Sequence, residues 1–401
     1  MGVRLGKGNW AVKTSKLLAY NDASGMFFNK EFDFTRATTA TRVNKSGLIE
    51  SVATNVPRID FTDDTKGHLL LEPASTNKIT YSQNFNLTGT PSSGTGRQNN
   101  ATTAPSLLPS PDGGTNAFTF IYDGTFNASI RKIVGVDADQ VITMSIFLKK
   151  TADTPVFSAD SDIRMGMFNN LAPNVSLNLG NALNAAPVGE WRRYSLSATG
   201  DSDGGQCVPN VRSDVAARID AFGWQVETNS FATSYIPTSG SSVTRNAELC
   251  NGSGAEQDFN SLEGVLYAEI AAIADDQQFK VISISDSSSN NEVLIRTFHT
   301  NPNVYNARVR ANASNAATMT NTVSDITQFN KIAVKYKSGD IGFFVNGVKV
   351  VSTTGTFTFT NNLNQLRFEG GGSGGDFYGK VREVRTYRTA LTDAELIALT
   401  T

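Results

Sequence analysis

Short runs in which apolar and polar residues alternate dominate the middle and C-terminal parts of the chain. Connectors rich in Gly, Ser, Asn, Thr and Asp separate these runs. A period of two places successive side chains on opposite faces of a strand. The runs with this pattern are 116–123, 141–150, 175–180, 190–199, 217–227, 264–274, 280–286, 291–299, 304–311, 330–337 and 342–353. The pattern predicts an all-β protein built from antiparallel sandwiches.

Two local signals refine this prediction near the C-terminus. Asn346-Gly347 lies between two alternating runs, and this dipeptide is typical of a type I′ hairpin because both central residues need positive φ. In "LTDAELIALTT", Thr392 is a candidate N-cap and Glu395 stands three residues later, which together form a capping-box signature. We therefore expect a hairpin at 346–347 and a short C-terminal helix of about two turns.

The first 80 residues show weak periodicity. The stretch "FDFTRATTATRVNKSGLIESVATNVPRIDF" (32–61) combines isolated apolar residues with Arg36, Arg42 and Arg58. Such a stretch cannot form a large core alone, so we expect an ordered, extended segment whose arginines donate to carbonyls or carboxylates. A solvated linker is the alternative. A loop region rich in Gly, Pro, Ser, Thr and Asn follows at 81–114.

Composition narrows the classes of protein. With 401 residues, the chain is long enough for two or three domains. We expect an N-terminal extended, anchoring segment (1–80), a jelly roll (81–250) and a second sandwich (251–401). The formal net charge of −2 offers no basic surface typical of nucleic-acid binding. Cys207 and Cys250 are expected to be two buried, inert thiols rather than a disulfide or a zinc site.

The first 20 residues contain no continuous apolar core of the kind found in signal peptides. No run of residues approaches the length of a membrane span. The sequence therefore predicts a protein that is made in a cytoplasm, without membrane insertion.

The C-terminal third resembles a known family. The runs "KIAVKYKSGDIGFFVNGVKVVSTT" and "GKVREVRTYRTALTDAEL" carry the hairpin, closing strand and helix typical of laminin-G/concanavalin A-like lectin domains. The resemblance covers about residues 255–401. It implies a concanavalin A-like sandwich, a fold that carries lectins, adhesion modules, hydrolases and structural domains alike.

A second resemblance covers roughly residues 25–248. The 32–61 stretch, "HLLLEPASTNKITYSQNF" and "GWQVETNSFATSYIPTSGSSVTRNAE" occur in this order. Together they resemble a module of structural proteins from tailed bacteriophages, in which an extended segment leads into a carbohydrate-binding-module-like jelly roll. The resemblance implies a virion protein that is assembled in the host cytoplasm and exposed on the particle surface. It also implies that the extended stretch docks on the jelly roll, with Thr244-Arg245 closing the same unit.

Virion proteins of this kind are frequently trimers, so a homo-oligomer, favouring a trimer, is expected. No heptad run provides a coiled-coil stalk. The N-terminal segment is then the candidate for anchoring to other virion proteins, through Trp10, Leu17, Leu18 and Tyr20. A frayed terminus is the alternative.

Alternation also indicates a candidate glycan site in the C-terminal sandwich. It places Arg296, Asn306, Arg308 and Arg310 on one sheet face, where they form a basic, polar strip suited to an acidic surface glycan. The alternatives are an ordinary solvated sheet face and a contact between subunits. Trp191 and Trp224 lie within strand patterns and are expected in the core.

Catalysis finds little support in the sequence. The two histidines, His68 and His299, lack a neighbouring serine or cysteine motif, and GxSxG and HExxH are absent. A depolymerase needs two carboxylates across a cleft, and the candidates on or beside expected strands are Glu190, Glu227, Glu269 and Glu292. We expect no enzymatic activity.

No cofactor is expected. The "DSDGG" stretch at 201–205 begins like a calcium loop, but Arg212 stands where an EF-hand needs a bidentate Glu. A structural Ca²⁺ in a sandwich loop is left open, with Asp201, Asp203 or Asp286 as donors. Ordinary Asx turns account for both stretches equally well.

These observations favour a non-enzymatic structural protein of a tailed-phage virion, of tail-fibre or receptor-binding type, whose lectin-like domains adhere to host surface glycans. One alternative is a capsid decoration or head-fibre protein that serves assembly and particle adhesion. The other is a tail-associated glycan depolymerase. The sequence does not identify the sugar or the location on the particle.

Overall fold

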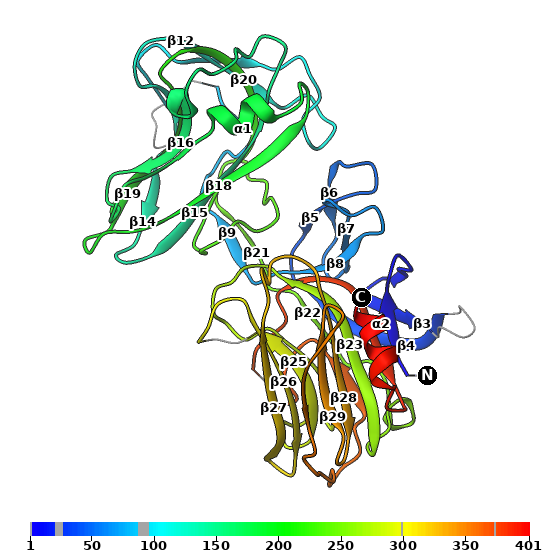
Figure 1. Ribbon diagram of the computed structural model, residues 1–401. Helices are drawn as coiled ribbons and strands as arrows, with labels where there is room; N and C mark the ends of the chain where they lie inside the picture. Colours follow the sequence, from blue (N-terminus) through cyan, green and yellow to red (C-terminus); the bar gives the residue numbers. More distant parts are fainter. Residues whose placement is uncertain (1, 21–26, 87–95, 298–299, 373) are drawn as a thin grey trace. The chain divides into compact units, whose positions relative to one another are not determined.

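The computed structural model describes residues 2–20, 27–86, 96–297, 300–372 and 374–401 (Figure 1). The chain divides into two compact units. Unit 1 consists of residues 1–45, 52–73 and 246–401, and unit 2 consists of residues 46–51 and 74–245. Unit 2 is therefore inserted between the two ends of unit 1. The N-terminal residues belong to the same unit as the C-terminal domain, because their strands enter its sheet.

Unit 1 contains a large antiparallel sheet, which is twelve-stranded over the described residues. Its main order is β22 (Leu249–Asn251), β4 (Phe27–Thr35), β3 (Lys16–Tyr20), β1 (Arg4–Gly6), β32 (Gly379–Tyr387), β23 (Glu263–Ala272), β28 (Asn330–Lys337), β29 (Ile341–Val345) and β30 (Val348–Thr353). Beside this path, β2 (Val12–Lys13) pairs with β3, β8 (His68–Leu71) with β32, and β7 (Arg58–Asp60) with β8.

A second, five-stranded sheet completes the sandwich of unit 1. Its order is β27 (Ser314–Thr322), β26 (Val304–Ala311), β25 (Glu292–Thr297), β24 (Val281–Ser285) and β31 (Gln365–Arg367). One apolar cluster joins side chains from both sheets, as in face-to-face sheet packing. Leu266 and Phe343 enter this cluster from the large sheet, and Ile295 and Tyr305 enter it from the second sheet.

Unit 2 is a sandwich of two antiparallel sheets. The first has the order β10 (Gly96–Gln98), β13 (Ala128–Arg131), β19 (Gly205–Ser213), β16 (Ile163–Phe168) and β17 (Val175–Asn178), with β14 (Val134–Val136) beside β19. The second has the order β11 (Thr102–Pro105), β12 (Phe118–Asp123), β20 (Ala216–Glu227), β15 (Val141–Lys149) and β18 (Trp191–Thr199). A separate pair, β9 (Ser75–Asn77) with β21 (Val243–Arg245), joins the two ends of this unit.

The 32–61 stretch is ordered, as expected, but it belongs mainly to unit 1. It contains the end of β4, then β5 (Ala40–Val43), β6 (Ile49–Val52) and β7. Phe32 and Phe34 are buried in the core of unit 1, which places the start of the stretch there. Residues 46–51 belong to unit 2, where the Ile49 N–H donates to the Pro111 carbonyl at 2.9 Å, so this part of the stretch docks on the jelly roll as expected. Thr244 and Arg245 lie in β21 of unit 2, so they share a unit with residues 46–51 of the stretch and not with the rest of it.

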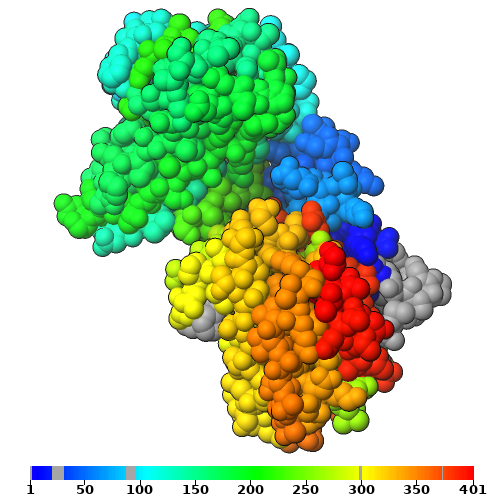
Figure 2. Space-filling view, in the orientation of Figure 1, coloured from blue at the N-terminus to red at the C-terminus, as the bar shows by residue number. Residues whose placement is uncertain are grey.

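Helices are few among the described residues: α1 (Gly180–Ala185), α2 (Asp393–Thr400), and the 3₁₀ turns η1 (Asp160–Asp162) and η2 (Glu256–Asp258). The capping box of α2 is confirmed, since Thr392 accepts from the Glu395 backbone N–H and Glu395 accepts from the Thr392 N–H. Figure 2 shows α2 (red) on the surface of unit 1 beside residues coloured orange. Leu396 of this helix is buried in a small apolar cluster with Val265 and Phe344. The hairpin is also confirmed, since Asn346 and Gly347 have φ of 48° and 80°.

Both cysteines are buried, free thiols. Burial raises the pKa of Cys207 to about 11, and burial likewise raises the pKa of Cys250. Thiolates are the reactive species, so we expect neither thiol to react rapidly with a disulfide reagent at pH 8 in the native protein. Both should react once the chain is unfolded. Rapid modification of one thiol in the native protein would contradict the buried positions.

Candidate functional site

The four residues of the polar strip (Arg296, Asn306, Arg308 and Arg310) lie on one face of the second sheet of unit 1, on β25 and β26. Their strand neighbours, such as Ile295 and Val309, are fully buried on the opposite, core-facing side. The predicted alternation is therefore correct for this sheet. Whether the strip binds a glycan stays a prediction.

Most residues of the polar strip make hydrogen bonds, ring contacts or ion pairs with other residues of unit 1. Arg296 Nε donates to Asn306 Oδ1 at 2.8 Å, and its guanidinium lies 4.4 Å from the centre of the Phe279 ring. Burial lowers the pKa of Arg296 to about 10, and the neighbouring charge of Arg308 adds to this effect. Arg308 pairs with the buried carboxylate of Glu292. Arg308 thus has a carboxylate partner within the fold, whereas the contacts of Arg296 are with neutral groups.

The predicted anchoring residues lie at the N-terminal strands of unit 1. Leu17 is fully buried in the core, so its side chain offers no surface to a partner. Trp10 is half-buried and its indole N–H donates to the Lys66 carbonyl at 3.0 Å, while Leu18 is half-buried. Tyr20 ends β3 opposite Arg4, and its side chain lies outside the described residues. Attachment to other virion proteins through this region stays a prediction.

The carboxylates considered for catalysis lie in separate environments. Glu190 pairs with Arg192 at the surface of unit 2, whereas Glu227 is fully buried and accepts from Ser75 Oγ at 2.7 Å. In unit 1, Glu269 lies 3.4 Å from Arg382, and Glu292 pairs with Arg308 as above. Each carboxylate is thus engaged in local structure.

The candidate calcium donors form turns. Asp201 Oδ1 accepts from the backbone N–H groups of Asp203 and Gly204, and Asp286 accepts from Ser288 and Asn291. Within the described ranges, no group of three or more His, Cys, Asp or Glu side chains is arranged to hold a metal ion. Among the same residues, no helix has the length and apolar content needed to cross a membrane.

His68 is buried at the start of β8, the position expected for a packed histidine, and His299 lies outside the described residues. The imidazole of His68 lies 3.7 Å from carboxylate oxygens of Asp60 and Asp64. Burial lowers the pKa of His68 to about 4, although these two carboxylates oppose the shift. His68 is therefore neutral at neutral pH.

This low pKa predicts a loss of stability in acid. An unfolded histidine binds its proton near pH 6.5, whereas folded His68 binds it only near pH 4. The free energy of unfolding should therefore fall by about 2–3 kcal/mol as the pH drops through this window. The check is urea unfolding of the full chain and of His68→Gln between pH 7 and 4. An identical pH dependence in both proteins would contradict this assignment.

The strongest candidate for a binding site is a hollow of about 200 Å³ on the first sheet of unit 2, lined by aromatic, amide and guanidinium groups. We call it the groove, lined chiefly by Gln98 (β10), Ser129 and Arg131 (β13), Phe168 (β16), and Asn210 and Arg212 (β19). Alternation creates it: Ile130 and Val211 lie in the core, so the flanking residues of the same strands face the other way. Gly166 leaves room for the Phe168 ring, because a Cβ at this position would lie 2.7 Å from it.

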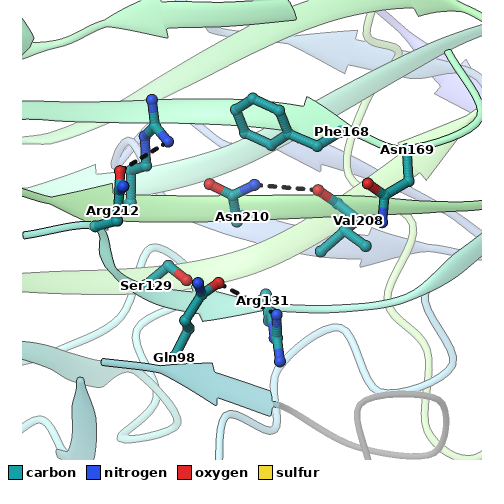
Figure 3. Close-up of a pocket in the computed structure, with 9 residues that line it drawn as sticks. Gln98, Ser129, Arg131, Phe168, Asn169, Val208, Asn210 and Arg212 are labelled. Carbon is teal, nitrogen blue, oxygen red and sulfur yellow. Dashed lines mark hydrogen bonds between the residues drawn. The ribbon is translucent and has the colours of Figure 1, made fainter. Parts of the chain in front are cut away.

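Asn210 is the most informative residue of the groove. The residue is only 4% exposed, and its amide nitrogen donates to the Val208 carbonyl at 3.1 Å. Its Oδ1 atom has no hydrogen-bond donor within the described part of the chain. Figure 3 shows Asn210 at the centre of the hollow, between Phe168 and the pair formed by Gln98 and Arg131. A buried acceptor without a partner is unfavourable, and a ligand donor could satisfy it.

Two arginines flank Asn210. Arg131 donates to Gln98 Oε1 at 3.3 Å, and Arg212 donates to Asn127 Oδ1 at 3.0 Å. The Nε atoms of both arginines are buried and find no acceptor among the residues that the structure describes. The Arg212 guanidinium also lies 5.1 Å from the centre of the Phe168 ring.

The charge at the groove is positive. Burial lowers the pKa of Arg212, and the positive charge of Arg164 lowers it further, while Asp214 opposes both effects. Asp214 itself pairs with Arg164. None of the residues that line the groove is a carboxylate.

The groove was not predicted from the sequence, because the predicted strands did not include β16 or β19. Pro209 interrupts β19, and a proline inside a run argues against a central strand. The available signal was the period-two order of Val208, Asn210 and Arg212 against Cys207 and Val211.

Residues 266–397 match the family model of the concanavalin A-like lectin/glucanases superfamily. Unit 1 therefore carries the predicted concanavalin A-like domain. A comparison with curated proteins finds no match.

Several solved structures resemble parts of the chain at low similarity. The Ruminococcus gnavus IT-sialidase CBM40 is 15% identical, with 38% of this chain and 94% of that chain covered and a TM-score of 0.31. Domain 4 of AbnA, an arabinanase from Geobacillus stearothermophilus solved with arabinotriose, is 14% identical, covering 39% and 73% at a TM-score of 0.31. The CBM22-1–CBM22-2 tandem of Paenibacillus barcinonensis Xyn10C is 11% identical, covering 78% and 98% at a TM-score of 0.28.

Proposed function

We propose that the chain is a non-enzymatic structural protein of a tailed-bacteriophage virion that adheres to host surface glycans through the groove of unit 2. The proposed glycan binding is supported by the combination of side chains that line the groove. A half-buried aromatic ring lies beside a buried amide and two guanidinium groups with unpartnered atoms. Sugars present apolar ring faces together with hydroxyl groups, so aromatic surfaces and planar hydrogen-bonding groups bind them well.

The virion part rests on the order of the three motifs in the N-terminal and central regions and on the concanavalin A-like domain at residues 266–397. The non-enzymatic part is supported by the lining of the groove. Glycoside hydrolysis uses a pair of carboxylates on either side of the bond to be cleaved. The groove offers guanidinium, amide and hydroxyl groups and no carboxylate.

Replacing Phe168 by alanine is expected to weaken glycan binding about tenfold, because a sugar ring would lose the aromatic surface on which it packs. Affinities should be measured on glycans selected from an array of bacterial surface polysaccharides. The matched control is Arg218→Gln, which alters an exposed side chain of β20 in the same unit. Thermal unfolding of both variants shows whether unit 2 stays folded. Undiminished binding by folded Phe168→Ala would place the glycan elsewhere.

Two further measurements test the rest of the proposal. The bound polysaccharide should keep its length after prolonged incubation with the protein, since shortening would favour the depolymerase alternative. Electron microscopy of intact particles with an antibody to residues 255–401 tests location. Label at the tail tip would support the receptor-binding role, whereas label spread over the head would favour a decoration or head-fibre protein. Particles without label would contradict a virion role.

A further inference from the structure

We propose that the groove of unit 2 selects glycans whose sugars carry a carboxylate, with Arg131 and Arg212 as the residues that bind it. This inference rests on the proposed glycan-binding function and names the class of sugar. It is based on the positive charge of the groove, on the spacing of the two arginines and on the buried polar atoms that lack a hydrogen-bond partner.

The charges of Arg131 and Arg212 are not balanced by acids of the groove. No lining residue is Asp or Glu. The nearby carboxylate of Asp214 has its oxygens engaged, since one pairs with Arg164 and the other accepts from the Asn127 backbone N–H at 2.9 Å. A neutral sugar would leave both guanidinium charges uncompensated, whereas a carboxylate supplies the missing negative charge.

The two arginines come from neighbouring strands and lie diagonally across the ladder. Arg131 stands opposite Asn210, and Arg212 stands opposite Ser129. Diagonal neighbours on one face of an antiparallel pair are about 7–8 Å apart at Cα. Two long side chains at this spacing can converge on one ligand group. Guanidinium groups bind carboxylates through paired, charge-assisted hydrogen bonds, which are stronger than bonds between neutral groups.

The hydrogen-bonding atoms of the groove that lack a partner also suit a carboxylate. Each Nε atom is a donor that is buried without an acceptor in the described structure. A carboxylate contributes only acceptors, so it would satisfy donors that sugar hydroxyls satisfy less strongly. Asn210 Oδ1, the unmet acceptor beside them, would take a hydroxyl of the same sugar. Each unmet atom in the centre of the groove thereby acquires a role.

The polar strip of unit 1 also has two buried Nε atoms without an acceptor in the described structure, at Arg308 and Arg310, but it already contains a carboxylate, that of Glu292. There Arg308 already pairs with Glu292, whose second oxygen accepts from the Gly371 N–H at 3.1 Å. An added carboxylate would compete with an internal one. Of the two basic surfaces, the groove therefore offers the better place for an acidic sugar.

The test is an array of acidic bacterial polysaccharides, each printed in its native form and in a form whose carboxylates have been reduced to alcohols. The full chain should bind at least one native polymer and lose about 10- to 100-fold in affinity on reduction. Arg131→Gln and Arg212→Gln should each weaken binding to the native form to a similar extent, and Arg218→Gln should not. Added salt should weaken the native interaction only.

The outcomes separate this inference from the proposed function. Equal binding to native and reduced forms, with Phe168→Ala still harmful, would overturn the carboxylate and leave glycan binding in place. Binding of a sulfated polymer as tight as that of the carboxylated ones would also overturn it, in favour of general anion binding. Failure to bind any form would overturn the proposed function together with this inference.

Discussion

Glu248→Ala is expected to lower the free energy of unfolding of unit 1 by about 3–5 kcal/mol, because it removes the carboxylate that two buried guanidinium groups share. Glu248 is 1% exposed and binds two arginines that are equally buried, Arg36 and Arg58. Burial opposes the charged form of Arg58, but Glu248 and Glu72 outweigh it and raise the pKa of Arg58. Without Glu248, Arg58 would keep its 2.8 Å pair with Glu72, whereas Arg36 would lose its pair with Glu248.

Urea unfolding followed by circular dichroism would measure this loss in the full chain. The matched control is Glu263→Ala, which removes a 3.0 Å pair with the exposed Lys337 in the same unit. Pairs near the surface contribute about 0–1 kcal/mol, so this variant should unfold almost as the parent does. Similar losses in the two variants would contradict the importance of burial at Glu248.

Trp224→Ala is expected to lower the free energy of unfolding of unit 2 by about 3–5 kcal/mol, through the cavity that it leaves. Trp224 is fully buried, as the sequence predicted, whereas Trp191 is only half-buried. The Trp224 ring stacks on Phe85 at 5.9 Å and lies 6.3 Å from Phe120. Removal of the indole therefore disturbs an aromatic cluster at the centre of the sandwich.

The control for this prediction is Trp224→Phe. Phenylalanine keeps an aromatic ring in the cluster and removes an indole N–H that has no acceptor in the described structure. We expect a loss smaller than about 1.5 kcal/mol for this variant. Circular dichroism during denaturant unfolding suits both variants, because tryptophan fluorescence itself changes with the substitution. Losses of the same size in both variants would argue against a cavity as the cause.

The all-β class, many strands, the 346–347 hairpin and the capped C-terminal helix could be predicted from sequence, because each depends on neighbouring residues. Alternation within a run determines which side chains share a face, so Arg296 and Arg308 were placed on one face correctly. Thr392 and Glu395 cap each other across one turn. Such signals need no knowledge of distant parts of the chain.

Helix α1 shows where local signals fail. Its N-cap, Leu179, makes no side-chain cap, and the helix is only six residues long. Tertiary packing holds it instead, because Leu179 and Leu183 enter the core of unit 2. The groove was missed for a similar reason. Gln98, Arg131 and Asn210 meet only when three strands from separate regions pair, and no spacing in the sequence records that pairing.

The arginines of the 32–61 stretch also have partners that lie far away in the sequence. Carbonyls or carboxylates were expected, and Arg36 indeed donates to the Ala53 carbonyl at 2.6 Å and to Glu248. Glu248 lies 212 residues further along the chain. The residue types indicated the kind of bond, whereas the identity of the partner depends on the insertion of unit 2 between them.

The insertion of unit 2 also determines the order in which the protein can fold during synthesis. In unit 1, β1 pairs with β32, with Arg4 opposite Arg385. β1 is synthesised early, so this pairing can form only when β32 emerges near the end of translation. Unit 2 has all its strands before residue 246 and can complete its sheets on the ribosome. Until β32 emerges, β1 and β8 expose unpaired edges, which are prone to association with other chains. The slow, long-range closure of unit 1 is thus the step at which newly made chains are most exposed to aggregation.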